Sequence, residues 1–207
     1  MSDTAAAVAA LGASFFERGL TFGRTGNISV RHHGRILLTP TGASLGALDP
    51  AGLSELDLDG AHLSGPRPSK EAFLHAAMYR ARPSAAAVIH LHSTHSVAVS
   101  CLADVDPHDV LPPLTAYYAM RVGHLPLLPY HAPGDDGLGP LVEGTAARHH
   151  ALLLANHGPV VAGRDLPAAA DAVEELEETA RIFLLLRGMR SRPLTPEQAG
   201  ELAAPGS

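Results

Sequence analysis

Hydrophobic side chains repeat along this chain with two different periods, and the pattern predicts helices mixed with strands. Spacings of three and four residues, typical of a helix with one buried face, predict helices at 4–19, 69–82, 94–103, 136–148 and 167–189. Ser69 and Ser93 are the expected N-caps of the second and third helices, and Pro167 is the expected first residue of the last.

Short runs of alternating or continuous apolar residues predict the strands. They lie within 25–31, at 35–39, within 54–64, and at 85–91, 151–155 and 160–162. Gly-containing turns join the early strands as hairpins, which favours one α/β domain over residues 1–207 with a mixed or antiparallel sheet. Residues 107–134 are rich in proline and glycine, so we expect loop and short strands near a surface site, and 190–207 should form a loose tail.

The composition excludes several classes of protein. Of the 207 residues 46% are hydrophobic, which argues against disorder, and the net charge of −6 argues against a general nucleic-acid-binding surface. The single cysteine, Cys101, excludes an intrachain disulfide and a cysteine-based zinc ribbon. The sequence has neither a signal-peptide pattern nor an apolar run of about 18 residues, so we expect a cytoplasmic protein with no membrane partner.

The basic residues direct attention to particular positions, because 13 histidines stand beside 15 lysines and arginines, and Lys70 is the one lysine. His90 and His92 should share one face of their strand, and His157 follows another buried strand. Three imidazoles would bind a metal and leave a coordination position open for water or substrate. For the His-x-His pair alone, the alternative is two hydrogen-bonded polar residues at a strand end.

Of the other histidines, His95 has no assigned role, and the rest are expected at the surface or in loops, in place of lysine or arginine. These are His32, His33, His62, His75, His108, His124, His131, His149 and His150.

A second group of candidates could bind an anion. Ser69, Lys70 and Glu71 lie at a predicted helix N-terminus, where backbone N–H groups favour negative charge. The plainer interpretation is an N-cap, an exposed lysine and an acidic residue that complements the helix dipole. The turns at 25–27 and 39–42 have free N–H groups that can surround a phosphate, although many hairpins look the same.

Five motifs, taken together and in this order, resemble the class II aldolase/adducin family. They are Gly26-Asn27-Ile28-Ser29, Leu38-Thr39-Pro40-Thr41-Gly42, Pro68-Ser69-Lys70-Glu71, Val88-Ile89-His90-Leu91-His92-Ser93-Thr94-His95 and Asn156-His157-Gly158. The resemblance implies an α/β/α fold with a central, largely antiparallel sheet flanked by helices. It also implies a homotetramer with active sites at the subunit interfaces.

The resemblance further implies the roles of individual residues. One Zn²⁺ per subunit would be bound by His90, His92 and His157, although Mn²⁺, Co²⁺ or Fe²⁺ would also suit these ligands. Glu71 would be the catalytic acidic residue and would also approach the metal. The substrate phosphate would be bound by Gly26, Asn27, Thr41, Gly42, Ser69 and Lys70. A tyrosine of the neighbouring subunit would correspond to Tyr117 or Tyr118.

The identities of two residues indicate which of the family's reactions to expect. The epimerases tend to have Asp where Glu71 stands, and the fuculose phosphate aldolases have a serine in place of Lys70. The extra cation suits a substrate with a carboxylate as well as a phosphate. Segments 120–135 and 174–180 also resemble the 3-oxo-tetronate 4-phosphate decarboxylase branch. We therefore expect decarboxylation of such a sugar acid to dihydroxyacetone phosphate and CO₂ through a metal-bound enediolate.

Three other functions compete with decarboxylation. The first is a sugar-phosphate aldolase of the fuculose or rhamnulose type, which would use the same metal and Glu71. The second is a non-catalytic adducin-like scaffold, but all the expected metal ligands are present in this chain. The third is a metal-dependent hydrolase, which would leave the phosphate-binding turns without a purpose.

Overall fold

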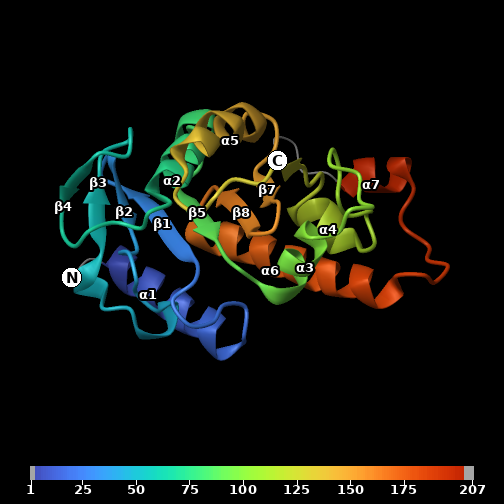
Figure 1. Cartoon of the computed structure of the whole chain (residues 1–207), viewed down its shortest axis with the longest axis horizontal. Coiled ribbons are helices and arrows are strands. Elements are labelled where there is room, and N and C mark those ends of the chain that lie inside the picture. The colour runs from blue at the N-terminus through green and yellow to red at the C-terminus, as the bar shows by residue number, and fades with distance from the viewer. Residues whose placement is uncertain (1–2, 203–207) are drawn as a thin grey trace.

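A computed structural model describes residues 3–202, and in it a central sheet lies between two layers of helices (Figure 1). The strands are β1 (Asn27–His32), β2 (Arg35–Leu38), β3 (Ser54–Leu56), β4 (His62–Ser64), β5 (Ala87–His90), β6 (Leu127–Leu128), β7 (Ala151–Leu154) and β8 (Gly158–Gly163). Their order across the sheet is β4-β3-β2-β1-β5-β8-β7-β6. Every neighbouring pair is antiparallel except β6 and β7, which confirms the expected sheet.

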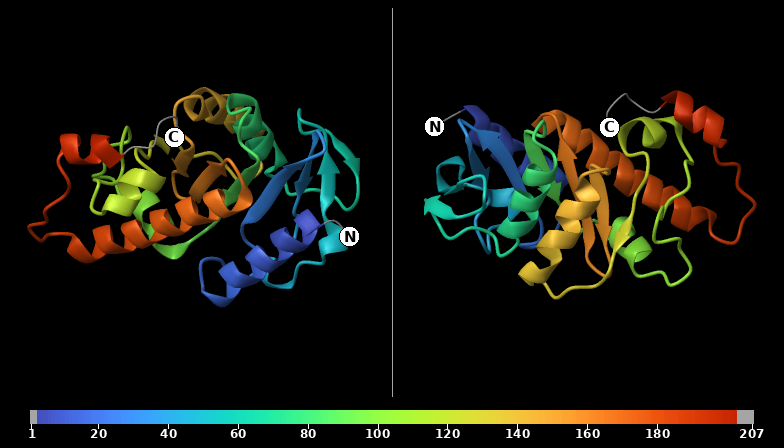
Figure 2. Two further views of the ribbon diagram at one scale, coloured as in Figure 1. Left: turned by 180° about the vertical axis from the view of Figure 1, so that it is seen from behind. Right: turned by 90° about the horizontal axis from the view of Figure 1, so that it is seen from above.

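The helices cover both faces of this sheet. They are α1 (Asp3–Glu17), α2 (Ala72–Ala81), α3 (Thr94–Ser100), α4 (Ala116–Arg121), α5 (Gly139–Ala146), α6 (Leu166–Leu186) and α7 (Pro196–Leu202), with single 3₁₀ turns at Leu45–Ala47, Pro50–Gly52 and Asp136–Leu138. Helices α2 and α5 lie on one side, and α1, α3 and α6 lie on the other (Figure 2). None of the helices within residues 3–202 is both long and apolar enough to cross a bilayer.

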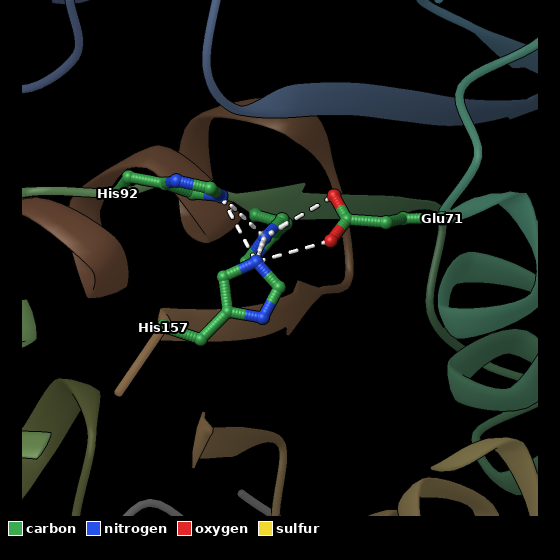
Figure 3. A group of neighbouring side chains, drawn as sticks. Glu71, His92 and His157 are labelled. Carbon is green, nitrogen blue, oxygen red and sulfur yellow. Dashed lines mark hydrogen bonds and ion pairs between the residues drawn. The ribbon is translucent and has the colours of Figure 1, made fainter. Parts of the chain in front are cut away.

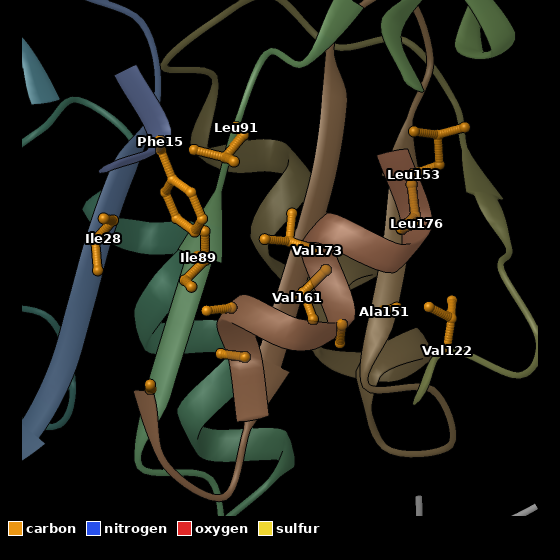
Figure 4. Packing of buried hydrophobic residues seen from close by; sticks show 14 of the residues in the cluster. Phe15, Ile28, Ile89, Leu91, Val122, Ala151, Leu153, Val161, Val173 and Leu176 are labelled. Atoms are coloured by element: carbon orange, nitrogen blue, oxygen red, sulfur yellow. The ribbon is translucent and has the colours of Figure 1, made fainter. Parts of the chain in front are cut away.

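Each face of the sheet has its own hydrophobic core. In the core under α1 and α6, Phe15 and Val173 pack against Ile89 (Figure 4). In the core under α2 and α5, Leu74 packs in the same cluster as Val88. Consecutive residues of β5 thus enter opposite cores, because side chains alternate along a strand. This explains why β5 is apolar at every position before His90.

The beginning of α2 differs from the prediction. The helix starts at Ala72, and Glu71 occupies the N-cap position without a side-chain cap. The hydroxyl of Ser69 accepts a hydrogen bond from the N–H of Glu71 at 3.2 Å, so it stabilises the turn before the helix. Ser93 has the N-cap position of α3, but its hydroxyl donates to the Leu20 carbonyl at 2.7 Å. The prediction that Ser69 is an N-cap is therefore wrong, whereas Ser93 has the predicted position but makes no side-chain capping hydrogen bond.

The sequence pattern also missed two helices. The first, α4, lies within the segment expected to be loop and short strands, and the Thr115 hydroxyl caps it by accepting from the N–H of Tyr118 at 3.0 Å. The second, α7, lies within the expected loose tail and beside α4 (Figure 1). The N–H of Leu194 donates to the Pro113 carbonyl at 2.9 Å, which attaches this part of the chain to the loop before α4. Residues 203–207 of the predicted tail lie outside the described part.

Candidate functional site

The candidate site lies at one end of the central strands of the sheet, where the ends of β1, β5 and β8 meet. Asn27 begins β1 and His90 ends β5, and because these strands are antiparallel the two residues are cross-strand partners. His157 lies in the tight turn between β7 and β8, and β8 pairs with β5. His92 follows β5 by two residues. Antiparallel pairing therefore brings together segments that are more than 60 residues apart in the sequence.

A glycine allows the β7–β8 turn to approach the segment after β5. Gly158 has a φ of 155°, and a Cβ atom added there would lie 2.3 Å from the carbonyl oxygen of Leu91. No side chain fits at that distance, so only glycine lets the backbone at His157 lie against this segment.

The three histidines direct their Nε2 atoms at one point. The Nε2 atoms of His90 and His92 are 3.1 Å apart, those of His92 and His157 are 3.1 Å apart, and those of His90 and His157 are 3.3 Å apart. Glu71 approaches from the opposite side to His92 (Figure 3). Its Oε1 is 3.1 Å from Nε2 of His157, and its Oε2 is 3.4 Å from Nε2 of His90.

This arrangement fits a metal ion. The four ligand atoms all lie within 4.8 Å of one another. Nitrogens bound tetrahedrally at the usual Zn–N distance would be about 3.3 Å apart, close to the spacing of the three Nε2 atoms. Nδ1 of His90 donates to the Pro159 carbonyl at 2.8 Å, which leaves Nε2 free to bind a cation. The residues predicted as ligands therefore form a cluster that is able to bind a metal ion.

The surroundings keep the imidazoles of His90 and His92 in the neutral form that binds metals. Burial lowers the pKa of His90, although the carboxylate of Glu71 opposes this effect. Burial, followed by the nearby His90 and His157, lowers the pKa of His92 to about 3. At neutral pH a metal would thus not have to displace a proton from His90 or His92.

Glu71, in contrast, is kept in its charged form. Burial by itself would raise its pKa, but His90, His157 and the side-chain N–H of Asn27 stabilise the charged form and hold the pKa of the carboxyl well below its ordinary range. The Asn27 amide donates to Oε2 at 2.8 Å. Glu71 is therefore a carboxylate at neutral pH, which the sequence did not predict in either direction.

A cleft of about 190 Å³ begins beside Glu71 and His92. Its lining includes all the residues predicted to surround a phosphate: Gly26, Asn27, Thr41, Gly42, Ser69 and Lys70. It also includes Arg24, which the sequence analysis missed, although a basic residue directly before the turn at 25–27 was a usable signal. Within residues 3–202, neither Arg24 nor Lys70 has an ion-pair partner, so both are available to an anion.

A second cavity, of about 410 Å³, continues on the other side of the cluster. It is lined by Phe22, His92, Thr94, Val97, Tyr130, His131, Pro133, Asn156 and His157. Because His92 and Pro133 line both cavities, a ligand can extend from the cleft at Lys70 past the histidines.

Burial decides two of the remaining predictions, and a contact places one further histidine. Tyr118 is fully buried in the core, whereas Tyr117 is 58% exposed and is available to another molecule. His75, expected at the surface, is fully buried, and that prediction is wrong. His95, which had no assigned role, contacts Glu177 of α6 through Nδ1 at 2.8 Å.

Known proteins resemble this chain over almost its whole length. The model of the Class II Aldolase and Adducin N-terminal domain matches residues 6–184. The 3-oxo-tetronate 4-phosphate decarboxylase of Haemophilus influenzae is 49% identical over 93% of this chain and 92% of its own length. The L-fuculose phosphate aldolase of Methanocaldococcus jannaschii is 37% identical over 82% of this chain and 90% of its own length.

The solved structures agree with the sequence relatives. The crystal structure of YgbL from Klebsiella pneumoniae has a TM-score of 0.93 and 45% identity over 96% of this chain and 97% of that chain. The names of the decarboxylase and aldolase relatives describe lyases, which confirms the expected class of enzyme. The chain belongs to the class II aldolase and adducin family.

Proposed function

We propose that this protein is a zinc-dependent decarboxylase that converts a 3-oxo-tetronate 4-phosphate to dihydroxyacetone phosphate and CO₂. The observation that carries the proposal is the cleft directly beside Glu71 and the histidine cluster, with two cations, Arg24 and Lys70, that form no ion pair with the described residues. Such a substrate has a phosphate and a carboxylate, so it matches a site with two cations better than a sugar phosphate does. The decarboxylases related at 48 to 49% identity support the same assignment.

Zinc is the ion that we propose for the cluster. Held by His90, His92 and His157, with Glu71 close by, it would supply a Lewis acid that polarises the keto oxygen of the substrate. The phosphate would be held in the cleft by the backbone N–H groups of the turns at 25–27 and 39–42, with Ser69, Lys70 and Arg24.

Glu71 would transfer to the substrate the proton that the reaction consumes. Release of CO₂ leaves the electron pair of the broken bond on C2 as an enediolate, and one proton must be added there to form the product. Because its pKa is held low, Glu71 begins as a carboxylate. It must therefore first take a proton from water and then transfer it to C2.

The proposed assembly is a homotetramer with active sites between subunits. Tyr117 is the tyrosine that we expect to reach a neighbouring site, because it lies exposed on α4 while Tyr118 is buried. This arrangement would add a phenolic hydroxyl to the metal centre of the next subunit.

A substrate panel tests the proposed reaction. Zinc-loaded protein is supplied with D- and L-series 3-oxo-tetronate 4-phosphates, made in situ by a kinase, and separately with fuculose and rhamnulose phosphates. CO₂, aldehyde and metal content are measured on the same sample. We expect CO₂ from a 3-oxo-tetronate 4-phosphate and little aldehyde from the sugar phosphates. Aldehyde release without CO₂ would replace the proposal with the aldolase function.

A further inference from the structure

A row of buried polar side chains extends from Glu71 into the protein, away from the cleft. Glu71, the N-cap residue of α2, is followed at intervals of four residues by His75 and Tyr79 of the helix, so the three side chains share one face. Asn27 and Ser29 are two residues apart in β1, so their side chains lie on the same side of the strand, and this side faces α2. All five are at most 8% exposed.

These side chains form one continuous chain of hydrogen bonds. Tyr79 Oη lies 3.0 Å from Ser29 Oγ, which lies 2.6 Å from His75 Nδ1. His75 Nε2 lies 2.5 Å from Asn27 Oδ1, and Asn27 Nδ2 lies 2.8 Å from Glu71 Oε2. Hydrophobic packing alone does not account for the positions of these five side chains, because each forms a hydrogen bond with its neighbour in the chain.

The carboxylate at one end determines where every proton in the chain lies. A carboxylate only accepts hydrogen bonds, so the Asn27 amide must turn its N–H towards Glu71 and its oxygen towards His75. His75 must then carry its proton on Nε2. Its ring is neutral, since burial lowers the pKa of His75 to about 3. Nδ1 therefore accepts from Ser29, and Ser29 accepts from Tyr79.

We propose that His75 is a positioning residue for Glu71. By donating from Nε2, it keeps the Asn27 amide in the single orientation in which its N–H holds Glu71 beside the histidine cluster. If the His75 proton were on Nδ1 instead, two acceptors would meet at Asn27, and a turned amide would present its oxygen to the carboxylate. The same amide also donates to Ser69 Oγ at 3.2 Å, so it links Glu71 to the cleft.

The proposal rests on the proposed function only for the role of Glu71, and its first test does not involve activity. NMR of protein labelled with ¹⁵N in histidine reports which ring nitrogen carries the proton. We expect His75 as the neutral Nε2–H form, and we expect Ser29→Ala to increase the Nδ1–H form because the donor to Nδ1 is lost. A wild-type ring with the proton on Nδ1 would overturn the proposal.

A pair of variants then tests the consequence for catalysis. In His75→Gln the amide nitrogen is the same number of bonds from Cβ as Nε2, so a donor to Asn27 remains, whereas His75→Leu has similar size and no donor. Loss of a partner behind a metal site typically costs about 10- to 100-fold in activity. We expect His75→Leu to lose kcat on that scale with less change in KM, and His75→Gln to recover most of it.

Three controls make the comparison decisive. Zinc content and the folded fraction are measured for each variant, and His62→Leu, on the exposed strand β4, should retain wild-type kcat. Equal kcat in His75→Gln and His75→Leu, at equal zinc and folded fraction, would mean that the donor is irrelevant and the role of His75 is structural. If His75→Leu does not fold, Ser29→Ala replaces it, and a mixed His75 tautomer with unchanged kcat would contradict the proposal.

The outcomes also separate this proposal from the proposed function. If the protein releases no CO₂ from any 3-oxo-tetronate 4-phosphate, the decarboxylase assignment fails. The tautomer of His75 can still be measured by NMR. The ratio of kcat between His75→Gln and His75→Leu can still be measured on aldol cleavage of fuculose phosphate. A histidine that positions Glu71 predicts the same ratio in that reaction.

Discussion

At the scale of single residues, Glu71 lies between two groups of neighbours with different chemistry. On one side its oxygens face the Nε2 atoms of His90 and His157, and on the other it accepts from Asn27. A carboxylate that is buried, ionised and adjacent to a metal-binding cluster is a strong candidate for proton transfer.

Replacing Glu71 by glutamine separates metal binding from proton transfer. Glu71→Gln keeps the size of the side chain and leaves the three histidines intact, so zinc content should stay near that of the wild type. Turnover should fall by at least about 100-fold, the usual contribution of a positioned acid or base. Metal analysis and steady-state kinetics check both results, with the exposed Glu178→Gln as the matched control. Unchanged turnover would remove Glu71 from the mechanism.

Buried histidines make the stability of the metal-free protein depend on pH. The pKa of His75 is lowered by burial from 6.5 to about 3, so below pH 6.5 the unfolded chain binds a proton there that the folded protein does not. The free energy of unfolding should therefore fall as pH decreases from 6.5 towards 3, by about 1.4 kcal/mol per pH unit for each such group. His92 contributes in the same direction.

Urea denaturation of chelator-treated protein at pH 7, 6 and 5 measures this dependence. His75→Gln removes one of the titrating groups, so its free energy of unfolding should depend less steeply on pH. An identical slope in the variant and the wild type would show that His75 takes up no proton on unfolding.

At the scale of elements, helix α3 is held in place by a carboxylate of α6. Oε1 of Glu177 accepts from the backbone N–H and Nδ1 of His95 at 2.9 and 2.8 Å. Oε2 accepts from the backbone N–H and hydroxyl of Ser96 at 2.9 and 2.7 Å. Because His92 lies just before α3, this contact also holds the segment that carries His92.

Removing this contact should destabilise the protein. In Glu177→Ala the two N–H groups at the start of α3 lose their charged acceptor, which should lower the free energy of unfolding by roughly 2 to 3 kcal/mol. Glu178→Ala is the matched control, because its side chain is 57% exposed and its pairing with Arg181 should contribute less than about 1 kcal/mol. Chemical denaturation compares the two. Equal effects would show that Glu177 does not stabilise α3.

At the scale of the whole molecule, the proposed tetramer predicts that an active site uses residues of two chains. Glu71 lies at the N-terminus of α2, while Tyr117 is exposed on α4 and packs against Arg121, whose guanidinium lies 5.1 Å from the centre of the ring. If Tyr117 serves the neighbouring subunit, inactive variants at these two positions should complement each other.

Mixed tetramers test this arrangement. The Glu71→Gln and Tyr117→Phe variants should each have low catalytic activity when expressed separately. Co-expressed in equal amounts, they should regain about one quarter of wild-type activity, because one site in four combines two native residues. Sedimentation gives the assembly state, and a chain with both substitutions is the negative control. No recovery in confirmed mixed tetramers would place both residues in the same chain's site or exclude Tyr117.

Local patterns in the sequence were sufficient for most elements and for the candidate metal ligands. Alternation predicted β1, β2, β5, β7 and β8, because a strand between two cores shows its period or its continuous apolar run directly. The order and spacing of the motifs identified His90, His92, His157 and Glu71. Short elements were missed: α4 has fewer than two turns between proline-rich and glycine-containing segments, so the helix is too short for its period to be detected.

Tertiary structure decided everything that depends on which distant residues cover a side chain. His75 looks like any other histidine in the sequence, and only the packing of α2 against β1 makes it a buried neighbour of Asn27. On the other face of the sheet, the packing of α4 buries Tyr118 in the core and leaves Tyr117 exposed. Periodicity is a property of neighbouring residues, whereas burial, pKa and the meeting of strand ends arise only when segments far apart in sequence come together.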